Sequence, residues 1–297
     1  MSERNSQLEG QLLITSVRTG NTEIFLVDAR WGDAVNLTRS ATSENRYPMW
    51  SPDGTQIVFT SDRGLHGTYD LYVMDADGKN VRRLTNVEEG GICYFPTWSG
   101  QAIYLGYAPP KDGEGVIGRV ASDGTGFEIV APGRDPAISP DGKTIAFTQT
   151  VNKGYCLFRM NAQGGDRQQL TRHENAIGAV APIWSPDGKK LLYSDEVSGK
   201  LEIFCCDEDG NEQRQLTKLG QFAASAAWSP DMKHISFRLT DYDYWRYPDA
   251  KEYIYREKKA DKRPVWVMEG DGSNPHVLEV AHYHCAMDGS RAAWKPK

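Results

Sequence analysis

The residues best suited to bind a metal lie near the end of the chain. Glu279, His282 and His284 place one carboxylate and two imidazoles within six residues. Carboxylate oxygens and imidazole nitrogens are ligands for Zn²⁺ and Mn²⁺, so this spacing could hold either ion. The alternative is two polar histidines in a surface loop. We favour that alternative and expect no cofactor.

A second set of polar residues could perform general acid–base chemistry. These residues lie in the connections between apolar runs along much of the chain. If carboxylates and histidines from several connections meet in one cavity, they could exchange protons with a substrate. Their spacing does not show which of them meet. The set comprises Glu44, Asn45, Arg46, Tyr47, Asp62, Arg63, His66, Glu88, Glu89, Tyr94, Arg134, Asp135, His173, Glu174, Asn175, Asp195, Glu196 and Arg238.

The third candidate is an aromatic insertion, residues 241–264. Large amphipathic rings suit sugar stacking or protein contact, so we expect a lid or platform for a ligand. Alternatively, the rings cover a neighbouring sheet edge. A capping pattern at Asp249 and Glu252 favours a short helix, whereas the apolar runs at 253–255 and 265–267 favour an extended hairpin. The candidate contact residues are Tyr242, Tyr244, Trp245, Arg246 and Tyr247.

Two arginines have opposite interpretations. Arg63 lies in a Ser-Asp-Arg-Gly loop and is expected to be structural. Arg238 stands where other parts of the chain have a small residue, such as Thr60 or Thr148. We expect Arg238 to anchor the insertion by hydrogen bonds. Alternatively, its guanidinium presents an anion-binding fork.

A repeated phrase must position all of these residues. Trp50-Ser51-Pro52-Asp53-Gly54 returns in complete or degraded form along the chain. The intervals between its anchors are 48, 40, 46, 44 and 66 residues, and a period of roughly 40–50 residues is typical of repeat architectures. The longest interval contains both the aromatic insertion and the Glu279 cluster. The anchor residues are Trp50, Trp98, Ile138, Trp184, Trp228 and Trp294.

Each repeat contains short runs rich in β-branched and aromatic residues. The Ser-Pro-Asp-Gly turn joins the first two runs. An Asp-Gly or Gly-Gly turn joins the third and fourth, and such dipeptides favour hairpins because type I′ turns need positive φ. The fourth run ends in Leu-Thr in several repeats, as at Leu84 and Thr85. The sequence therefore predicts blades of four antiparallel strands, with the tryptophan on the first strand.

The two ends of the chain complement each other. Residues 11–38 match the last three strands of a repeat, and residues 291–296 match the first strand. We expect the C-terminal strand to complete the first blade, because this pairing removes two exposed sheet edges. The six anchors then predict an all-β fold, one six-bladed β-propeller over residues 1–297. Loops of variable length should surround one end of its central channel, the mouth, where function concentrates on such scaffolds.

The composition excludes some functions. The net charge is −6 and the isoelectric point is near 5.6, which argues against a nucleic-acid partner. No run approaches ~18 apolar residues, so no membrane span is expected. The polar N-terminus and the odd, scattered cysteines predict a cytoplasmic protein. The alternative is a periplasmic or secreted protein whose signal peptide is missing from this sequence.

On these repeats, the chain resembles the TolB-like β-propellers. The resemblance covers essentially the whole chain and implies the propeller alone, because the N-terminal domain of TolB has no counterpart. Residues 236–239 and 262–268 also resemble the propellers of prolyl-oligopeptidase-type enzymes, but no Gly-x-Ser-x-Gly motif is present. The Glu279 cluster is similar in spacing to metal residues of oligogalacturonate lyases. A further upstream metal histidine of those enzymes has no counterpart, and His234 is expected at a turn.

The favoured function is a non-enzymatic, monomeric binding module that recognises a protein segment or a glycan at the mouth. The alternative is a carbohydrate-active enzyme, a lyase or hydrolase acting on an acidic oligosaccharide. In that case, arginines would bind uronate carboxylates, and His282 or His284 would act as a base or metal ligand. A structural subunit of a larger assembly is the third possibility. Outside the insertion, the candidate contact residues are Arg46, Tyr47, Arg63, His66, Tyr94, His173 and Arg238.

Overall fold

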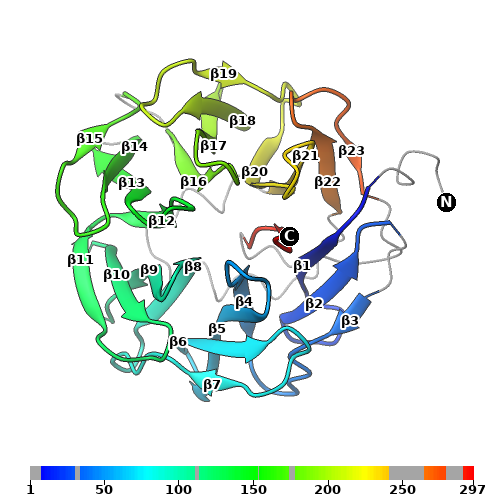
Figure 1. Cartoon of the computed structure of the whole chain (residues 1–297), viewed down its shortest axis with the longest axis vertical. Coiled ribbons are helices and arrows are strands. Elements are labelled where there is room, and N and C mark those ends of the chain that lie inside the picture. Colours follow the sequence, from blue (N-terminus) through cyan, green and yellow to red (C-terminus); the bar gives the residue numbers. More distant parts are fainter. Residues whose placement is uncertain are drawn as a thin grey trace.

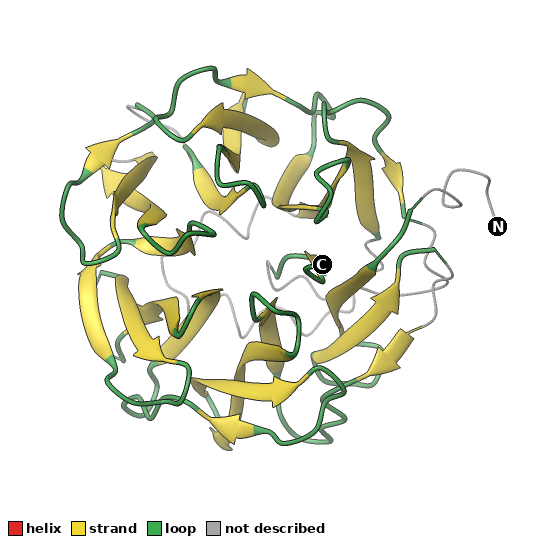
Figure 2. Cartoon of the chain, viewed as in Figure 1, coloured by secondary structure: helices red, strands yellow, loops and turns green. Residues whose placement is uncertain are grey.

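The computed structural model describes residues 8–30, 34–110, 114–152, 154–173, 178–240, 264–278 and 290–297. All regular elements in these ranges are β-strands, numbered β1 to β24 along the chain (Figures 1 and 2). The predicted all-β class is thus confirmed. Within the same ranges, no helix is long and apolar enough to cross a membrane.

The strands form sets of four. The first set contains β24 (Ala293–Trp294), β1 (Gln11–Ser16), β2 (Glu23–Asp28) and β3 (Ala34–Asn36). The second contains β4 (Asn45–Trp50), β5 (Gln56–Leu65), β6 (Thr68–Asp75) and β7 (Arg82–Arg83). The third contains β8 (Ile92–Ser99), β9 (Ala102–Ala108), β10 (Val116–Ala121) and β11 (Glu128–Pro132).

The remaining sets have the same organisation. The fourth contains β12 (Arg134–Ile138), β13 (Thr144–Val151), β14 (Gly154–Asn161) and β15 (Gln168–Gln169). The fifth contains β16 (Val180–Trp184), β17 (Lys190–Val197), β18 (Lys200–Asp207) and β19 (Arg214–Gln215). The sixth contains β20 (Phe222–Trp228), β21 (His234–Thr240), β22 (Val265–Glu269) and β23 (His276–Val277).

Neighbouring strands within each set are antiparallel, as the sequence predicts. One parallel bridge, between Tyr69 and Ile92, joins the second and third sets into a single eight-stranded sheet. Figure 1 shows the sets around a common centre, with β4, β8, β12, β16 and β20 as inner strands. The short strands β7, β15 and β19 lie at the periphery. The ends of the inner strands therefore converge near the middle of the molecule.

The Ser-Pro-Asp-Gly phrase forms the tight turn after each inner strand that carries it. In its first copy, the Ser51 hydroxyl donates to Asp53 Oδ1 at 2.6 Å and accepts the Gln56 N–H at 2.9 Å. Gly54 has a φ of 66°, which favours glycine. The phrase is therefore part of the scaffold. The same serine–aspartate hydrogen bond is present at Ser139–Asp141, Ser185–Asp187 and Ser229–Asp231.

The apolar core lies between neighbouring sets, and the tryptophans help to fill it. Trp50, Trp184 and Trp294 are buried. The indole N–H of Trp50 donates to the carbonyl of Ala293 at 3.2 Å, and that of Trp184 donates to Ala137 at 3.0 Å. Both acceptors lie on the inner strand of the preceding set. Each of these tryptophans therefore ties one set to the next.

A glycine contact also repeats between consecutive sets. The turn between the third and outer strands places its glycine against the outer segment of the preceding set. A Cβ atom at Gly78 would lie 2.6 Å from the Leu37 carbonyl oxygen, and one at Gly210 would lie 3.0 Å from that of Leu170. The Asp-Gly pattern thus reflects packing between sets as well as turn geometry. Gly124 against Leu84, Gly164 against Val130 and Gly272 against Leu216 repeat the arrangement.

The last strand pairs with the first. β24 is antiparallel to β1, with Leu12 opposite Trp294 and Leu13 opposite Ala293. The Lys295 N–H also donates to the Gln11 carbonyl at 2.8 Å. The indole N–H of Trp294 donates to Ser236 Oγ, in the sixth set, at 3.1 Å. The predicted pairing of the C-terminal strand with the first set is therefore present.

Candidate functional site

Five inner strands share an irregularity near their N-terminal ends, which follow the loops at the mouth. The pairing of β4, β8, β12, β16 and β20 with the following strand shifts register between the residues four positions and one position before the anchor. At such a β-bulge, the strand can turn a side chain away from the regular pleat. One non-glycine residue in each bulge has a φ between 45° and 57°. These residues are Tyr47, Phe95, Asp135, Ala181 and Ser225.

Side chains at this level cross the centre of the molecule. The ring centroids of Tyr47 and Phe95 are 4.6 Å apart. Arg291, just before β24, donates Nη2 to the Pro182 carbonyl at 2.8 Å, and its guanidinium lies 5.5 Å from the Phe95 ring centroid. Phe95 and Pro182 belong to the third and fifth sets, so Arg291 reaches across from the first. Buried side chains from the first, second and third sets therefore contact one another or the fifth set at the level of the bulges.

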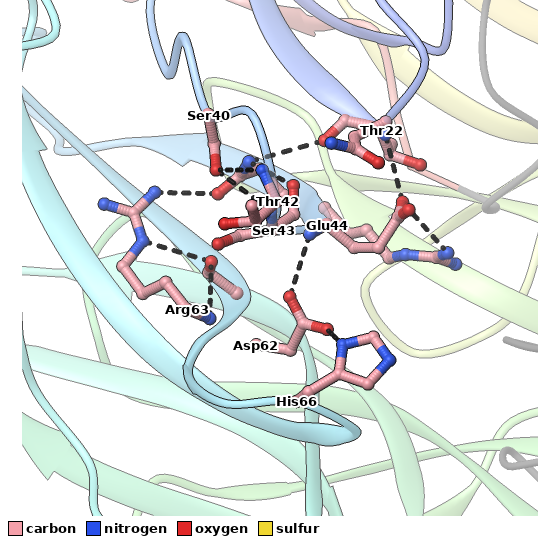
Figure 3. A network of polar contacts seen from close by, with 12 residues as sticks. Thr22, Ser40, Thr42, Ser43, Glu44, Asp62, Arg63 and His66 are labelled. Carbon is pink, nitrogen blue, oxygen red and sulfur yellow. Dashed lines mark hydrogen bonds and ion pairs between the residues drawn. The ribbon is translucent and has the colours of Figure 1, made fainter.

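Figure 3 shows a polar network at the mouth ends of the first two sets. Arg63 donates Nη2 to Asn45 Oδ1 at 2.7 Å and Nε to Ser61 Oγ at 3.1 Å. Its guanidinium also lies 4.9 and 5.0 Å from the ring centroids of Phe59 and Tyr72. These contacts are consistent with the structural role predicted for Arg63, although Arg63 lies within β5 and not in a loop.

Two histidines at the mouth each lie against a carboxylate. His66 Nδ1 lies 3.0 Å from Asp62 Oδ2, and Asp62 Oδ1 accepts the Glu44 N–H at 2.8 Å (Figure 3). His173 Nε2 lies 3.1 Å from Asp195 Oδ2. The hydrogen bond with Asp195 raises the pKa of His173 above its usual value, although burial opposes this shift. The His66 side chain is 81% exposed and that of His173 is 22% exposed, so His66 is the more accessible.

A buried acid at the start of the third strand recurs in three sets. In the second set, Asp70 accepts the Thr85 hydroxyl at 2.7 Å and the Val87 N–H at 3.0 Å. The threonine Oγ in turn accepts the Leu71 N–H at 2.9 Å. Because the Thr85 hydroxyl takes the place of a backbone acceptor for Leu71, the pairing of β7 with β6 ends at Arg83. The outer strand therefore ends before Leu84 and Thr85, where the sequence predicted its end. The related pairs are Glu23–Thr38 and Glu202–Thr217.

Arg134 lies among tyrosines at the mouth end of the fourth set. Its Nη1 donates to the Tyr155 hydroxyl at 2.9 Å, and its guanidinium lies 5.4 Å from the Tyr155 ring centroid. Tyr94 also shares a side-chain hydrogen bond with Arg134. Burial raises the pKa of Tyr94 to about 12, so this phenol remains neutral. Arg134 itself is half-buried.

The structure places several predicted contact residues in the interior. Arg46, Tyr47, Tyr94 and Arg238 are all buried. Arg46 lies 3.5 Å from Glu44, and Arg238 donates to Thr15 Oγ1 at 3.4 Å. The predicted anchoring of the aromatic insertion by Arg238 concerns residues 241–263, which lie outside the described ranges.

Of the other predicted residues, Glu88 and Glu89 are exposed and Glu196 is half-buried on β17, and the rest lie outside the described ranges. They include the aromatic candidates of the insertion and the Glu279 cluster. Within the described ranges, no group of three or more histidine, cysteine or acidic side chains could hold a metal. His234, predicted at a turn, is instead the first residue of β21 and lies 3.8 Å from Glu269. The undescribed candidates are Glu174, Asn175, Tyr242, Tyr244, Trp245, Arg246, Tyr247, Glu279, His282 and His284.

Sequence reasoning missed the buried acids and Arg291. A signal for the acids was present, because Glu23, Asp70 and Glu202 each precede their threonine partner by 15 residues. No comparable signal marks Arg291. Its contacts with the third and fifth sets arise only when the ends of distant strands meet.

The comparisons with known proteins agree with this architecture. A family model described as the TolB beta propeller domain matches residues 7–178 and 135–242. The chain belongs to this TolB β-propeller family. A TolB homologue from Chlorobium luteolum is 29% identical over 156 residues, which cover 50% of this chain and 33% of that protein. An uncharacterised peptidase, YuxL of Bacillus subtilis, is 27% identical over 158 residues, covering 52% of this chain and 22% of its own. The matches thus span a third or less of these relatives.

Solved structures share the fold at lower identity. A putative TolB from Agrobacterium tumefaciens superimposes with a TM-score of 0.71 at 19% identity, covering 96% of this chain and 92% of that one. An oligogalacturonate lyase in complex with manganese gives a TM-score of 0.52 at 13% identity, covering 91% of this chain and 74% of the lyase. At these identities, the likeness concerns the fold.

Proposed function

We propose that this TolB-family chain is a non-enzymatic module that binds a polypeptide segment at the mouth. The observation that carries the proposal is that buried acids near the mouth form hydrogen bonds within the scaffold. Asp70, Glu23 and Glu202 receive hydrogen bonds from threonines and loop N–H groups, so they serve the scaffold. The two histidines lie against separate carboxylates. This arrangement supports a surface for recognition more than a centre for proton transfer.

The proposal includes a closed ring. The first to sixth sets would be the six blades of one propeller over residues 1–297, with the first blade built from 11–38 and 291–296. The pairing of Leu12 with Trp294 and the bond from Trp294 to Ser236 support this closure, because they join β24 to the first and sixth sets. A single domain, a monomeric state and a cytoplasmic location remain predictions.

The ligand is proposed to contact the mouth loops and the aromatic insertion. Tyr244 and Trp245 would supply large apolar contact area, and residues of this type carry much of the binding energy in protein interfaces. His66 is the exposed imidazole at the tip of the hairpin between β5 and β6. The buried side chains at the bulges would form the floor below the ligand.

A peptide selection tests this function. Random peptides displayed on phage are selected on the purified chain, and the recovered peptides are titrated by fluorescence anisotropy. We expect saturable binding that weakens at least about tenfold when Tyr244 and Trp245 are both replaced by alanine. Lys79→Ala is the control, because Lys79 lies in an exposed turn between β6 and β7. If the recovered peptides bind the Tyr244→Ala/Trp245→Ala variant as tightly as the unmodified chain, the proposed location is wrong. If no peptide binds saturably, the proposed function is wrong.

A metal-dependent lyase is the second candidate. It is favoured by the spacing of Glu279, His282 and His284 and by the fold likeness to the manganese-bound lyase. Elemental analysis of the purified chain separates the two functions. Stoichiometric manganese or zinc that disappears in a His282→Ala/His284→Ala variant would favour the lyase. Metal-free protein would contradict it.

A further inference from the structure

Arg134 and Arg46 occupy equivalent places on their strands but have different surroundings. Each lies directly before the positive-φ residue of its bulge. The Arg46 side chain is 3% exposed and lies 3.5 Å from the carboxylate of Glu44. Arg134 is half-buried, and its described hydrogen bonds go to the phenols of Tyr94 and Tyr155. Arg46 therefore lies in an ion pair, whereas the hydrogen-bond partners described for Arg134 are neutral hydroxyls.

The carboxylate nearest to Arg134 in sequence, that of Asp135, interacts with two arginines. Asp135 is buried, and it interacts electrostatically with both Arg134 and Arg291. Arg291 in turn contacts the Pro182 carbonyl and the Phe95 ring. Asp135 is therefore shared between two guanidiniums and does not serve Arg134 alone.

The contacts of Arg134 also hold its guanidinium in a fixed plane. The Tyr155 hydroxyl accepts from Nη1 while the Tyr155 ring lies beneath the guanidinium at 5.4 Å. A held guanidinium loses little side-chain entropy when it binds a planar partner, and its fork matches a carboxylate. A carboxylate therefore fits this position better than a single neutral acceptor.

We infer that Arg134 is the carboxylate-binding residue of the mouth, and that the polypeptide ligand carries an acidic group there. The inference rests on the proposed function and adds the chemistry of the partner. Tyr155 and Tyr94 position the guanidinium. The acidic group comes from an aspartate or glutamate side chain or from a chain terminus, since both present the same two oxygens.

A double-mutant cycle tests the inference with the peptides recovered in the selection. Each peptide is made as the parent, with its acidic side chains as amides, and with an amidated C-terminus. These forms are titrated against the unmodified chain, Arg134→Met and the control Arg119→Met, whose arginine lies on β10 beside Glu128. We expect the loss of one carboxylate and the loss of Arg134 each to weaken binding about tenfold, as for a charge-assisted hydrogen bond. Together, they should weaken it little further, and Arg119→Met should have no effect.

The amide forms distinguish the two sources of the carboxylate. Thermal unfolding of each variant checks the fold, and Tyr155→Phe keeps the charge of Arg134 while removing its acceptor. We expect Tyr155→Phe to weaken binding of the acidic parent more than binding of the amide forms. Peptides that bind with no coupling to Arg134 would overturn the inference and leave the binding function standing. Arg134-dependent binding of digalacturonate instead of the peptides would assign the site to the carbohydrate alternative and overturn the inference.

Discussion

At the scale of single residues, the polar side chains of the mouth divide into two groups. The buried acids, such as Asp70, complete the backbone hydrogen bonding where the outer strand ends. The half-buried or exposed groups, such as Arg134 and His66, have side chains that can reach solvent. Residue type does not separate the groups, because acids, histidines and arginines occur in loops for both reasons. Burial and hydrogen-bond partners do separate them.

Asp70→Ala is expected to destabilise the chain by about 3 kcal/mol, because it removes the acceptor for Thr85 and Val87 and the partner of Arg83. Chemical denaturation followed by tryptophan fluorescence measures the change. Asp77→Ala is the control, since Asp77 lies in the exposed turn after β6 and should change the stability little. Equal effects of the two substitutions would refute the structural role of Asp70.

His173 should make the stability depend on pH. Its pKa is raised in the folded chain, chiefly by the hydrogen bond with Asp195, so protonation of the imidazole stabilises the fold. This contribution is fully present below the unfolded pKa and is lost as pH rises through the folded value. His173→Gln should therefore lower the melting temperature more at about pH 5.5 than at about pH 8. The two decreases should differ by roughly 1–3 °C. A difference that is constant with pH would rule out this contribution.

At the scale of elements, the turns carry both local and long-range information. Asp-Gly dipeptides favour hairpins, and the structure has turns at those places. The same glycines also touch the preceding set, as at Gly210 and Leu170. The sequence could predict the hairpin because a turn involves adjacent residues. It could not predict the contact, which joins segments about one repeat apart.

A pair of glycines separates the two contributions. Gly199 and Gly210 both have a φ of 80°, but a Cβ at Gly199 would meet nothing within 4 Å, whereas one at Gly210 would lie 2.9 Å from Leu170 Cβ. Alanine at either site should cost about 1 kcal/mol through backbone strain. Gly210→Ala should cost roughly 1–3 kcal/mol more, because the neighbouring set must move. Equilibrium denaturation of both variants measures the difference, and equal costs would mean that this contact contributes nothing.

At the scale of the whole molecule, the C-terminal strand links the first and sixth sets. Deletion of residues 292–297 should lower the melting temperature far more than deletion of Lys297 alone, because it removes Trp294 and the pairing with β1. Trp294→Ala should itself cost about 3–5 kcal/mol, as for other buried tryptophans. Differential scanning calorimetry measures both. A truncated chain with unchanged thermal stability would refute the closure of the ring.

The sequence by itself determined the strands, their grouping in fours and the pairing of the two chain ends. Each of these follows from local patterns: an apolar run, a turn dipeptide or a repeated tryptophan. Only the tertiary structure decided which polar residues meet. Arg291 joins Phe95 and Pro182, and Asp135 lies among two arginines, because the inner strands bring their ends to one centre. The repeat fixes the position of a residue within its own set. The partners of that residue depend on how the sets are arranged around the centre.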